Sequence, residues 1–165
     1  MKNVFSEGSI NKQVVIYSLA ILILLTSLFC ALLFYQHTKG NELLVDKFST
    51  DIRGFLFNID EVVNEDSFFI IDGWACRQDE EIKKVLCWVV LKDIEENKYF
   101  KINTLLVKRK DVTQAIADGV NYDNSGFTAK INKSLLKKNT QYQIYILYLN
   151  NDNQVLINTN KNLSF

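Results

Sequence analysis

Hydrophobic residues follow two different patterns along this chain. Residues 14–35 (VVIYSLAILILLTSLFCALLFY) form an unbroken apolar run without a charge, a proline or a glycine. As a helix rising about 1.5 Å per residue, the run extends roughly 33 Å, slightly more than the hydrocarbon core of a bilayer. It is longer than the apolar part of a cleaved signal peptide, and no A-x-A-like site follows it. We therefore predict a single transmembrane helix over 14–35, kept as an uncleaved signal anchor.

The segments that flank this run bear on orientation. Two lysines precede the run, and three basic residues follow it within about 20 positions. The positive-inside rule therefore gives only a weak preference for one orientation of the helix. The short tail of residues 1–13 favours a cytoplasmic N-terminus. We expect a single-pass protein of the cytoplasmic membrane whose C-terminal part lies outside the cytoplasm. Residues 36–53 are polar and mixed, and we interpret them as a stalk that is helical over NELLVDKF.

Beyond the stalk, short apolar alternations are separated by breaks rich in Asn and Asp. A period of two is typical of strands with one buried face, and it places Phe55, Phe57 and Ile59 on one face of the first strand. Residues 84–92 (KVLCWVVLK) are nearly continuously apolar, which indicates a central strand. The pattern predicts an all-β domain over 54–165, an immunoglobulin-like sandwich of about seven strands, with a barrel as the alternative. The predicted strands are 55–63, 67–76, 84–92, 98–107, 126–131, 141–149 and 154–159.

The stretch RKDVTQAIADGVNYDNSGF combines charges, a short helical pattern and an Asn/Asp/Gly turn. Asp111 is well placed as a helix N-cap, with Gln114 three residues later. Gly119 can take the left-handed conformation that closes a helix. Arg109 can reach Asp111 or the backbone beside it, and Phe127 enters the core with the next strand. We interpret the stretch as framework, a short crossover helix between the two sheets.

Three short motifs occur in order along the domain: DGWAC at 72–76, RKDV at 109–112 and SGF at 125–127. Together they resemble a small β-sandwich module of bacterial envelope proteins, which occurs beside glycosyltransferases and in secreted or membrane-attached proteins linked to surface polysaccharide. The resemblance covers the chain from residue 55 to residue 160. It implies a structural role, and it brings no activity because no catalytic domain of the module's usual neighbours is present. The residues that match the module are Gly73, Trp74, Ala75, Arg109, Asp111, Val112, Gly126 and Phe127.

Residues that carry chemistry are sparse. The only histidine, His37, follows the span, and no metalloprotease motif, phosphate-binding loop or EF-hand loop occurs. We expect no enzyme activity, no cofactor and no metal, with calcium on the Asn/Asp turns at 121–124 or 150–153 as an alternative. Lys plus Arg and Asp plus Glu both number 19, so no charge is left over to neutralise phosphates. We therefore expect no nucleic-acid partner.

Two cysteines and two tryptophans leave alternatives open. Cys76 and Cys87 flank the centre of a predicted hairpin, which would place them opposite each other. In an exported domain they can form a disulfide if their Cα atoms lie within about 6.8 Å; the alternative is two buried free thiols. Trp74 and Trp88 can stack on sugar rings, but both lie inside strand patterns, and we expect them to pack in the core.

The anchor, the β-rich domain and the family resemblance together favour a non-catalytic, membrane-anchored module of the bacterial cell envelope. Its expected ligand is a surface or envelope polysaccharide. The alternative is an assembly or regulatory partner of an integral-membrane protein, such as a polytopic glycosyltransferase or another envelope complex. An envelope hydrolase or transferase is the third hypothesis. The membrane is a partner in each case.

Overall fold

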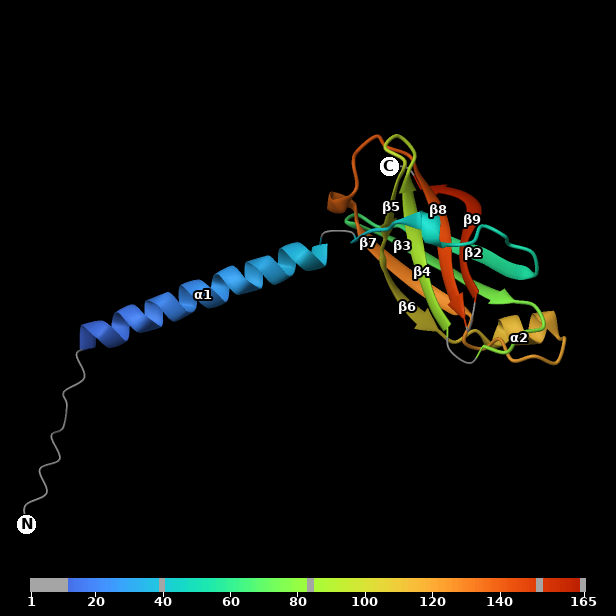
Figure 1. Ribbon diagram of the computed structural model, residues 1–165, viewed down its shortest axis with the longest axis horizontal. Helices are drawn as coiled ribbons and strands as arrows, with labels where there is room; N and C mark the ends of the chain where they lie inside the picture. Colours follow the sequence, from blue (N-terminus) through green and yellow to red (C-terminus); the bar gives the residue numbers. More distant parts are fainter. Residues whose placement is uncertain (1–11, 39–40, 83–84, 151–152, 164–165) are drawn as a thin grey trace, which may run out of the picture. The chain divides into compact units, whose positions relative to one another are not determined.

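Two compact units make up the chain, divided between residues 39 and 40 (Figure 1). The first contains helix α1 (Lys12–Thr38). Its stretch Lys12–Leu33 is long and apolar enough to span a membrane, with a mean hydropathy of 2.6 and no buried side chains. The predicted span over 14–35 is therefore a helix of the required length and composition. The computed structural model describes residues 12–38, 41–82, 85–150 and 153–163.

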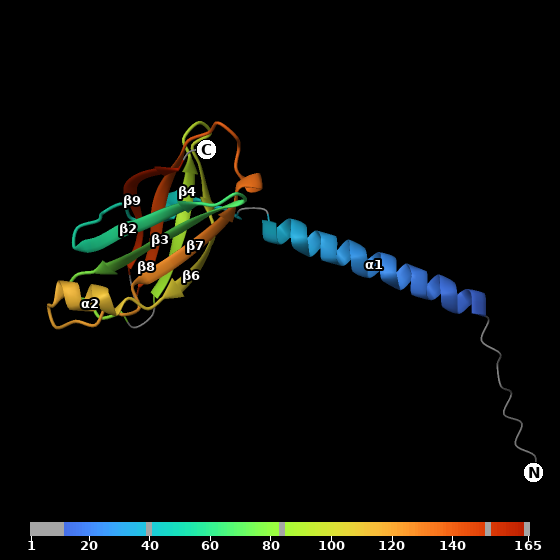
Figure 2. The same cartoon turned by 180° about the vertical axis from the view of Figure 1, so that it is seen from behind.

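The second unit contains, in its described residues, nine strands in two sheets, and neighbouring strands within each sheet are antiparallel (Figures 1 and 2). The five-stranded sheet has the order β1-β5-β4-β8-β9, and the four-stranded sheet has the order β2-β3-β7-β6. The strands and the short 3-10 turns η1 and η2 are β1 (Asn41–Glu42), η1 (Val45–Lys47), β2 (Phe55–Asn64), β3 (Phe68–Arg77), β4 (Val85–Asp93), β5 (Lys98–Lys101), β6 (Asn103–Val107), β7 (Gly126–Asn132), η2 (Lys133–Leu135), β8 (Tyr142–Asn150) and β9 (Asn153–Leu163).

Side chains that face between the two sheets form the main core. Strand β2 contributes Phe55, Phe57 and Ile59, as the alternation predicts. Strand β4 is bonded to a neighbour on each side and places Val89 and Leu91 in the same core, where both are fully buried. The burial of this apolar surface is the main favourable contribution to folding. The arrangement is two separate sheets, so the barrel alternative does not hold.

All seven predicted strands form, but the segment 98–107 makes two strands rather than one. β5 pairs with β4 in one sheet, whereas β6 pairs with β7 in the other. Between them Ile102 is buried, and its N–H donates to the Val89 carbonyl oxygen at 3.0 Å. The Val89 N–H donates to Thr104 Oγ1, also at 3.0 Å. The chain therefore changes sheets at Ile102, within a single stretch of extended backbone.

The prediction of a stalk over 36–53 is wrong for residues 41–53, which belong to the domain. β1 adds to the edge of β5, and the chain then runs across the outer face of the five-stranded sheet. Leu43, Val45 and Phe48 pack there against outward-facing side chains of β4 and β8. The physical reason is that β4 is apolar on both faces, and an apolar outer face requires a cover.

Helix α2 (Lys110–Ile116) joins β6 to β7, which are neighbours in one sheet, so the predicted crossover between sheets is wrong. The prediction of Asp111 as N-cap is also wrong. Arg109 occupies that position, no side chain caps the helix, and the Asp111 carboxylate bonds the Arg109 guanidinium instead. Ala117, with a φ of 52°, rather than Gly119 takes the left-handed conformation that ends the helix.

Candidate functional site

The eight residues of the family resemblance are joined by direct contacts around β3, β7 and α2. Gly73 on β3 pairs with Phe127 on β7, and the Phe127 ring fills the space beside it. A Cβ added to Gly73 would lie 2.8 Å from that ring and 2.4 Å from the Asn58 carbonyl oxygen. Ala75 and Phe127 are fully buried in the main core. This part of the motif therefore serves close packing between strands.

The opposite face of β3 carries a smaller apolar cluster. Trp74 pairs in register with Gly126 and packs, half-buried, beside Val112 of α2. Val112 is 3% exposed, and Tyr122 closes the cluster from the loop after the helix. Helix α2 thus covers one end of the four-stranded sheet, and Trp74 and Val112 hold it there.

Arg109 ties the helix to strands β2 and β7. Its Nε and Nη2 donate to Asp111 at 2.9 and 2.7 Å, and its Nη1 donates to Asp60 on β2. The bonds to Asp111 first, and to Asp60 second, raise the pKa of Arg109. The aliphatic stem lies against Gly126, where an added Cβ would come within 2.4 Å of Arg109 Cγ. The geometry supports a structural role for this arginine.

In the turn after α2, side-chain oxygens that could bind calcium accept hydrogen bonds from neighbouring residues instead. The Asp123 carboxylate accepts from Thr113 Oγ1 at 2.7 Å, and Asn121 Oδ1 accepts the Asp123 N–H at 2.9 Å. Among the described residues no group of three or more His, Cys, Asp or Glu side chains could hold a metal ion. The calcium alternative at 150–153 falls partly on residues 151 and 152, which lie outside the described residues.

Cys76 and Cys87 are both free and buried. They do not face each other across a hairpin, because β3 and β4 belong to different sheets. Cys87 lies in the main core, and Cys76 lies in the cluster beneath α2. Burial, followed by the nearby Asp118 carboxylate, raises the pKa of Cys76 to about 12. Burial also raises the pKa of Cys87.

Trp88 lies on the outer face of β4 and is half-buried in the cluster covered by residues 43–48. Lys101 Nζ lies 4.3 Å from the centre of its ring, which is cation–π geometry. The face of Trp88 is thus occupied by the chain itself. Both tryptophans pack against apolar clusters, as the strand patterns predict.

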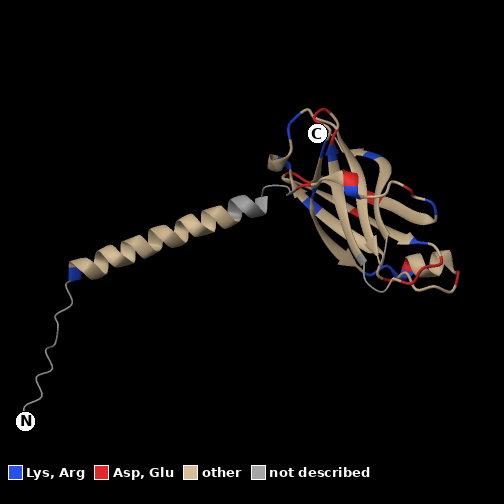
Figure 3. Cartoon of the chain, viewed as in Figure 1, with Lys and Arg blue, Asp and Glu red and all other residues tan. Residues whose placement is uncertain are grey.

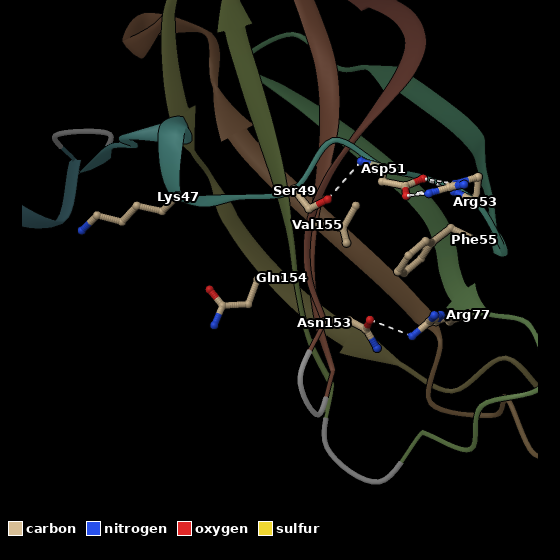
Figure 4. A pocket seen from close by; sticks show the side chains of 9 residues that line it. All are labelled: Lys47, Ser49, Asp51, Arg53, Phe55, Arg77, Asn153, Gln154 and Val155. Atoms are coloured by element: carbon tan, nitrogen blue, oxygen red, sulfur yellow. Dashed lines mark hydrogen bonds and ion pairs between the residues drawn. The ribbon is translucent and has the colours of Figure 1, made fainter.

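A polar hollow of about 500 Å³ lies where the segment before β2 crosses the start of β9 (Figure 4). Two backbone bonds hold the crossing: the Ser49 N–H donates to the Gln154 carbonyl, and the Leu156 N–H donates to the Ser49 carbonyl, both at 2.9 Å. The hollow is open to solvent and mostly polar. Its lining residues are Lys47, Ser49, Asp51, Arg53, Phe55, Arg77, Asn153, Gln154 and Val155.

Two guanidinium groups dominate the chemistry of this hollow. Arg53 binds Asp51 through two nitrogens, at 2.9 and 2.5 Å, with 90% of its side chain exposed. These bonds lower the pKa of Asp51 to about 2. Arg77 Nη1 donates to Asn153 Oδ1 at 2.7 Å and to Glu80 at 3.2 Å. The lining contains three cations, Lys47, Arg53 and Arg77, and one carboxylate, Asp51. With Glu80, which bonds Arg77 from outside the lining, one positive charge is left in excess.

Sequence reasoning missed this hollow entirely. Its residues come from the segment 47–55, the end of β3 and the start of β9, which are remote in sequence. No motif links them, and the predicted stalk over 36–53 places four of the nine outside the domain. In Figure 3 the charged residues are spread along the whole domain, so the distribution of charge does not point to the hollow either.

No family model, no curated protein and no solved structure matches this chain.

Proposed function

We propose that the chain is a non-catalytic, membrane-anchored module of the cell envelope that holds an immunoglobulin-like sandwich outside the cytoplasm and binds an acidic envelope polysaccharide. The apolar helix α1 supports the anchor. The motif residues are used for packing within the domain. This supports a structural role for them and ligand binding at a different surface. The observation that carries the proposal is the polar hollow at the start of β9.

The strand order supports the immunoglobulin-like architecture. In such domains one sheet has the order A-B-E-D and the other contains C, F and G, with C′ added beside C in some members. With β2 as strand A, the chain order makes β2-β3-β7-β6 the A-B-E-D sheet. The same lettering makes β5-β4-β8-β9 the C′-C-F-G sheet. Only β1 lies outside this scheme.

The chemistry of the hollow suits a hydrated, acidic sugar. Pockets for apolar small molecules are enclosed and lined mainly by hydrophobic side chains, which this hollow is not. Guanidinium and amide groups form paired hydrogen bonds to carboxylates and to neighbouring hydroxyls. Arg53 and Gln154 supply such groups, and Phe55 offers a small apolar surface. The excess positive charge favours a uronic acid or a phosphate-bearing sugar over a neutral one.

The test is binding of the domain, residues 40–165, to polygalacturonate as an acidic probe and to dextran as a neutral one. We expect salt-sensitive binding to the acidic polymer. Arg53→Gln should weaken it about tenfold, the scale of one charge-assisted hydrogen bond. Lys161→Gln is the matched control, because Lys161 is an exposed cation on the same strand β9, away from the hollow. Equal loss in both variants, or no binding to either polymer or to extracted envelope polysaccharide, would refute the glycan proposal.

Assembly with an integral-membrane protein is the alternative function, and the full chain tests it. Purification in mild detergent should yield the chain without a stoichiometric membrane enzyme if the glycan proposal holds. Constant co-purification of one polytopic protein would favour the alternative.

A further inference from the structure

Three of the four sheet edges in the described residues carry features that block pairing with another chain. The β1 edge is two residues long. The β9 edge is bridged by Ser49 near its start and carries a register irregularity against β8. The β2 edge has a bulge at Asp60 and presents charged side chains there. Short strands, bulges, charges and covering segments are the devices by which natural sheets avoid edge-to-edge association.

Strand β6 has none of these devices. It pairs with β7 in continuous register and has no described neighbour on its other side. Its sequence NTLLV has no charge, proline or glycine. Leu105, Leu106 and Val107 are 63%, 46% and 39% exposed, a run of three aliphatic side chains on a regular edge. Such an edge is a template for one more strand.

We propose that β6 pairs with β6 of a second copy of this chain, antiparallel about a two-fold axis at Leu105. A two-fold interface brings the same surface of each copy together, so the segment must complement itself. About this axis Leu105 meets the partner's Leu105, Thr104 meets the partner's Leu106, and Asn103 meets the partner's Val107. No like charges meet, because the segment has none. The two four-stranded sheets then continue as one sheet of eight strands.

The membrane anchor explains why a second copy is the occupant. A five-residue edge buries less than the roughly 800 Å² per partner of a standard stable interface, so pairing of free domains is weak. Helix α1 confines copies to one surface, which raises their effective concentration without any new contact. Pairing at β6 rests on the anchor of the proposed function but uses a surface separate from the polar hollow, so glycan binding and pairing can each fail without the other.

Cross-linking of the full chain in phosphatidylcholine vesicles tests the pairing. Directly opposed residues of antiparallel strands have Cα atoms about 4.5–5.5 Å apart, within the roughly 4.4–6.8 Å of a disulfide. In a Cys30→Ser background, Leu105→Cys should oxidise to a covalent dimer as the main product. Asn58→Cys on the guarded β2 edge and the exposed Leu135→Cys are the matched controls and should cross-link several-fold less. Thr104→Cys should cross-link with Leu106→Cys in mixed vesicles, but not with itself.

A second measurement uses no disulfide. Energy transfer between copies labelled at their N-termini should fall to the level of random lipid-diluted mixing when Leu105 is changed to Lys, while Leu135→Lys leaves it unchanged. Cross-linking of Leu105→Cys no faster than Asn58→Cys would overturn the proposal. Transfer that is equal in wild type and Leu105→Lys would overturn it as well.

Discussion

Gly126 lies directly beneath the side chain of Arg109, so that a Cβ on Gly126 would stand 2.4 Å from Arg109 Cγ and 2.7 Å from the Val107 carbonyl oxygen. The contact joins the first residue of β7 to the arginine that bonds Asp60 and Asp111. Because Gly126 has no side chain, Arg109 has room to form its ion pairs with Asp60 and Asp111.

This relationship predicts that Gly126→Ala destabilises the domain. The new methyl group cannot move away from the Val107 backbone, and overpacking of this kind costs about 1–3 kcal/mol. Urea unfolding of residues 40–165 measures it. In the double variant with Arg109→Ala, part of the loss should be recovered, since one of the two clashes disappears. Additive effects of the two substitutions would mean that the side chains do not touch.

Phe127→Ala should destabilise the domain by about 3–5 kcal/mol, the usual range for a fully buried ring. The lost ring packs against Gly73 in the centre of the core, so little can collapse into the space. Leu135→Ala is the control, because Leu135 is 48% exposed and its truncation should change stability little. The same unfolding experiment compares the two. A loss of polysaccharide binding without a loss of stability in Phe127→Ala would make this region a ligand loop instead of framework.

Acid should weaken the contact around Asp51. Its folded pKa of about 2 lies below the ordinary value of about 3.9 because Arg53 bonds the carboxylate. A lowered folded pKa contributes stability that is fully present above about pH 4 and is lost as the pH falls towards about 2. NMR titration of the Asp51 carboxyl measures the midpoint directly. Arg53→Gln should return that midpoint towards the ordinary value; a midpoint near 3.9 already in the wild type would show that the ion pair does not form.

The thiols of Cys76 and Cys87 should be unreactive towards thiol reagents in the folded domain. Both are buried with raised pKa values, and only the thiolate reacts rapidly. In the domain from residue 40, an Ellman titration at pH 8 should report almost no thiol until urea unfolds the protein, and then two. Prompt reaction of either thiol in the native domain would contradict the burial. Two thiols that appear only after reduction would show that the cysteines are bonded in the exported protein.

Alternation along the chain was enough to predict the strands, because each has one face in a shared core, as Phe55, Phe57 and Ile59 show. It could not reveal the change of sheet at Ile102, since a hydrophobic pattern does not say with which neighbouring strand each residue pairs. The cover formed by Leu43, Val45 and Phe48 was also missed. A short apolar segment between polar residues gives no sign of which surface it will meet.

The candidate site was less accessible to such reasoning. The bond of Arg109 to Asp111 was among the expected contacts, but its bond to Asp60 depends on a bulge in a distant strand. The hollow is lined by both Arg53 and Asn153, which lie a hundred positions apart in the chain. The two segments lie side by side because Ser49 pairs with Val155 at the start of β9.

The proposed function requires a domain displayed outside the cytoplasm on a membrane anchor, and protease access tests this most directly. Trypsin is added to cells whose outer barrier has been opened while the cytoplasmic membrane is intact. Lys39 is the first basic residue after the span, so digestion should leave a protected fragment that ends there. We predict loss of the domain and survival of that fragment. A domain that stays intact until the cytoplasmic membrane is lysed, and is cleaved only then, would reverse the topology and contradict the proposed function.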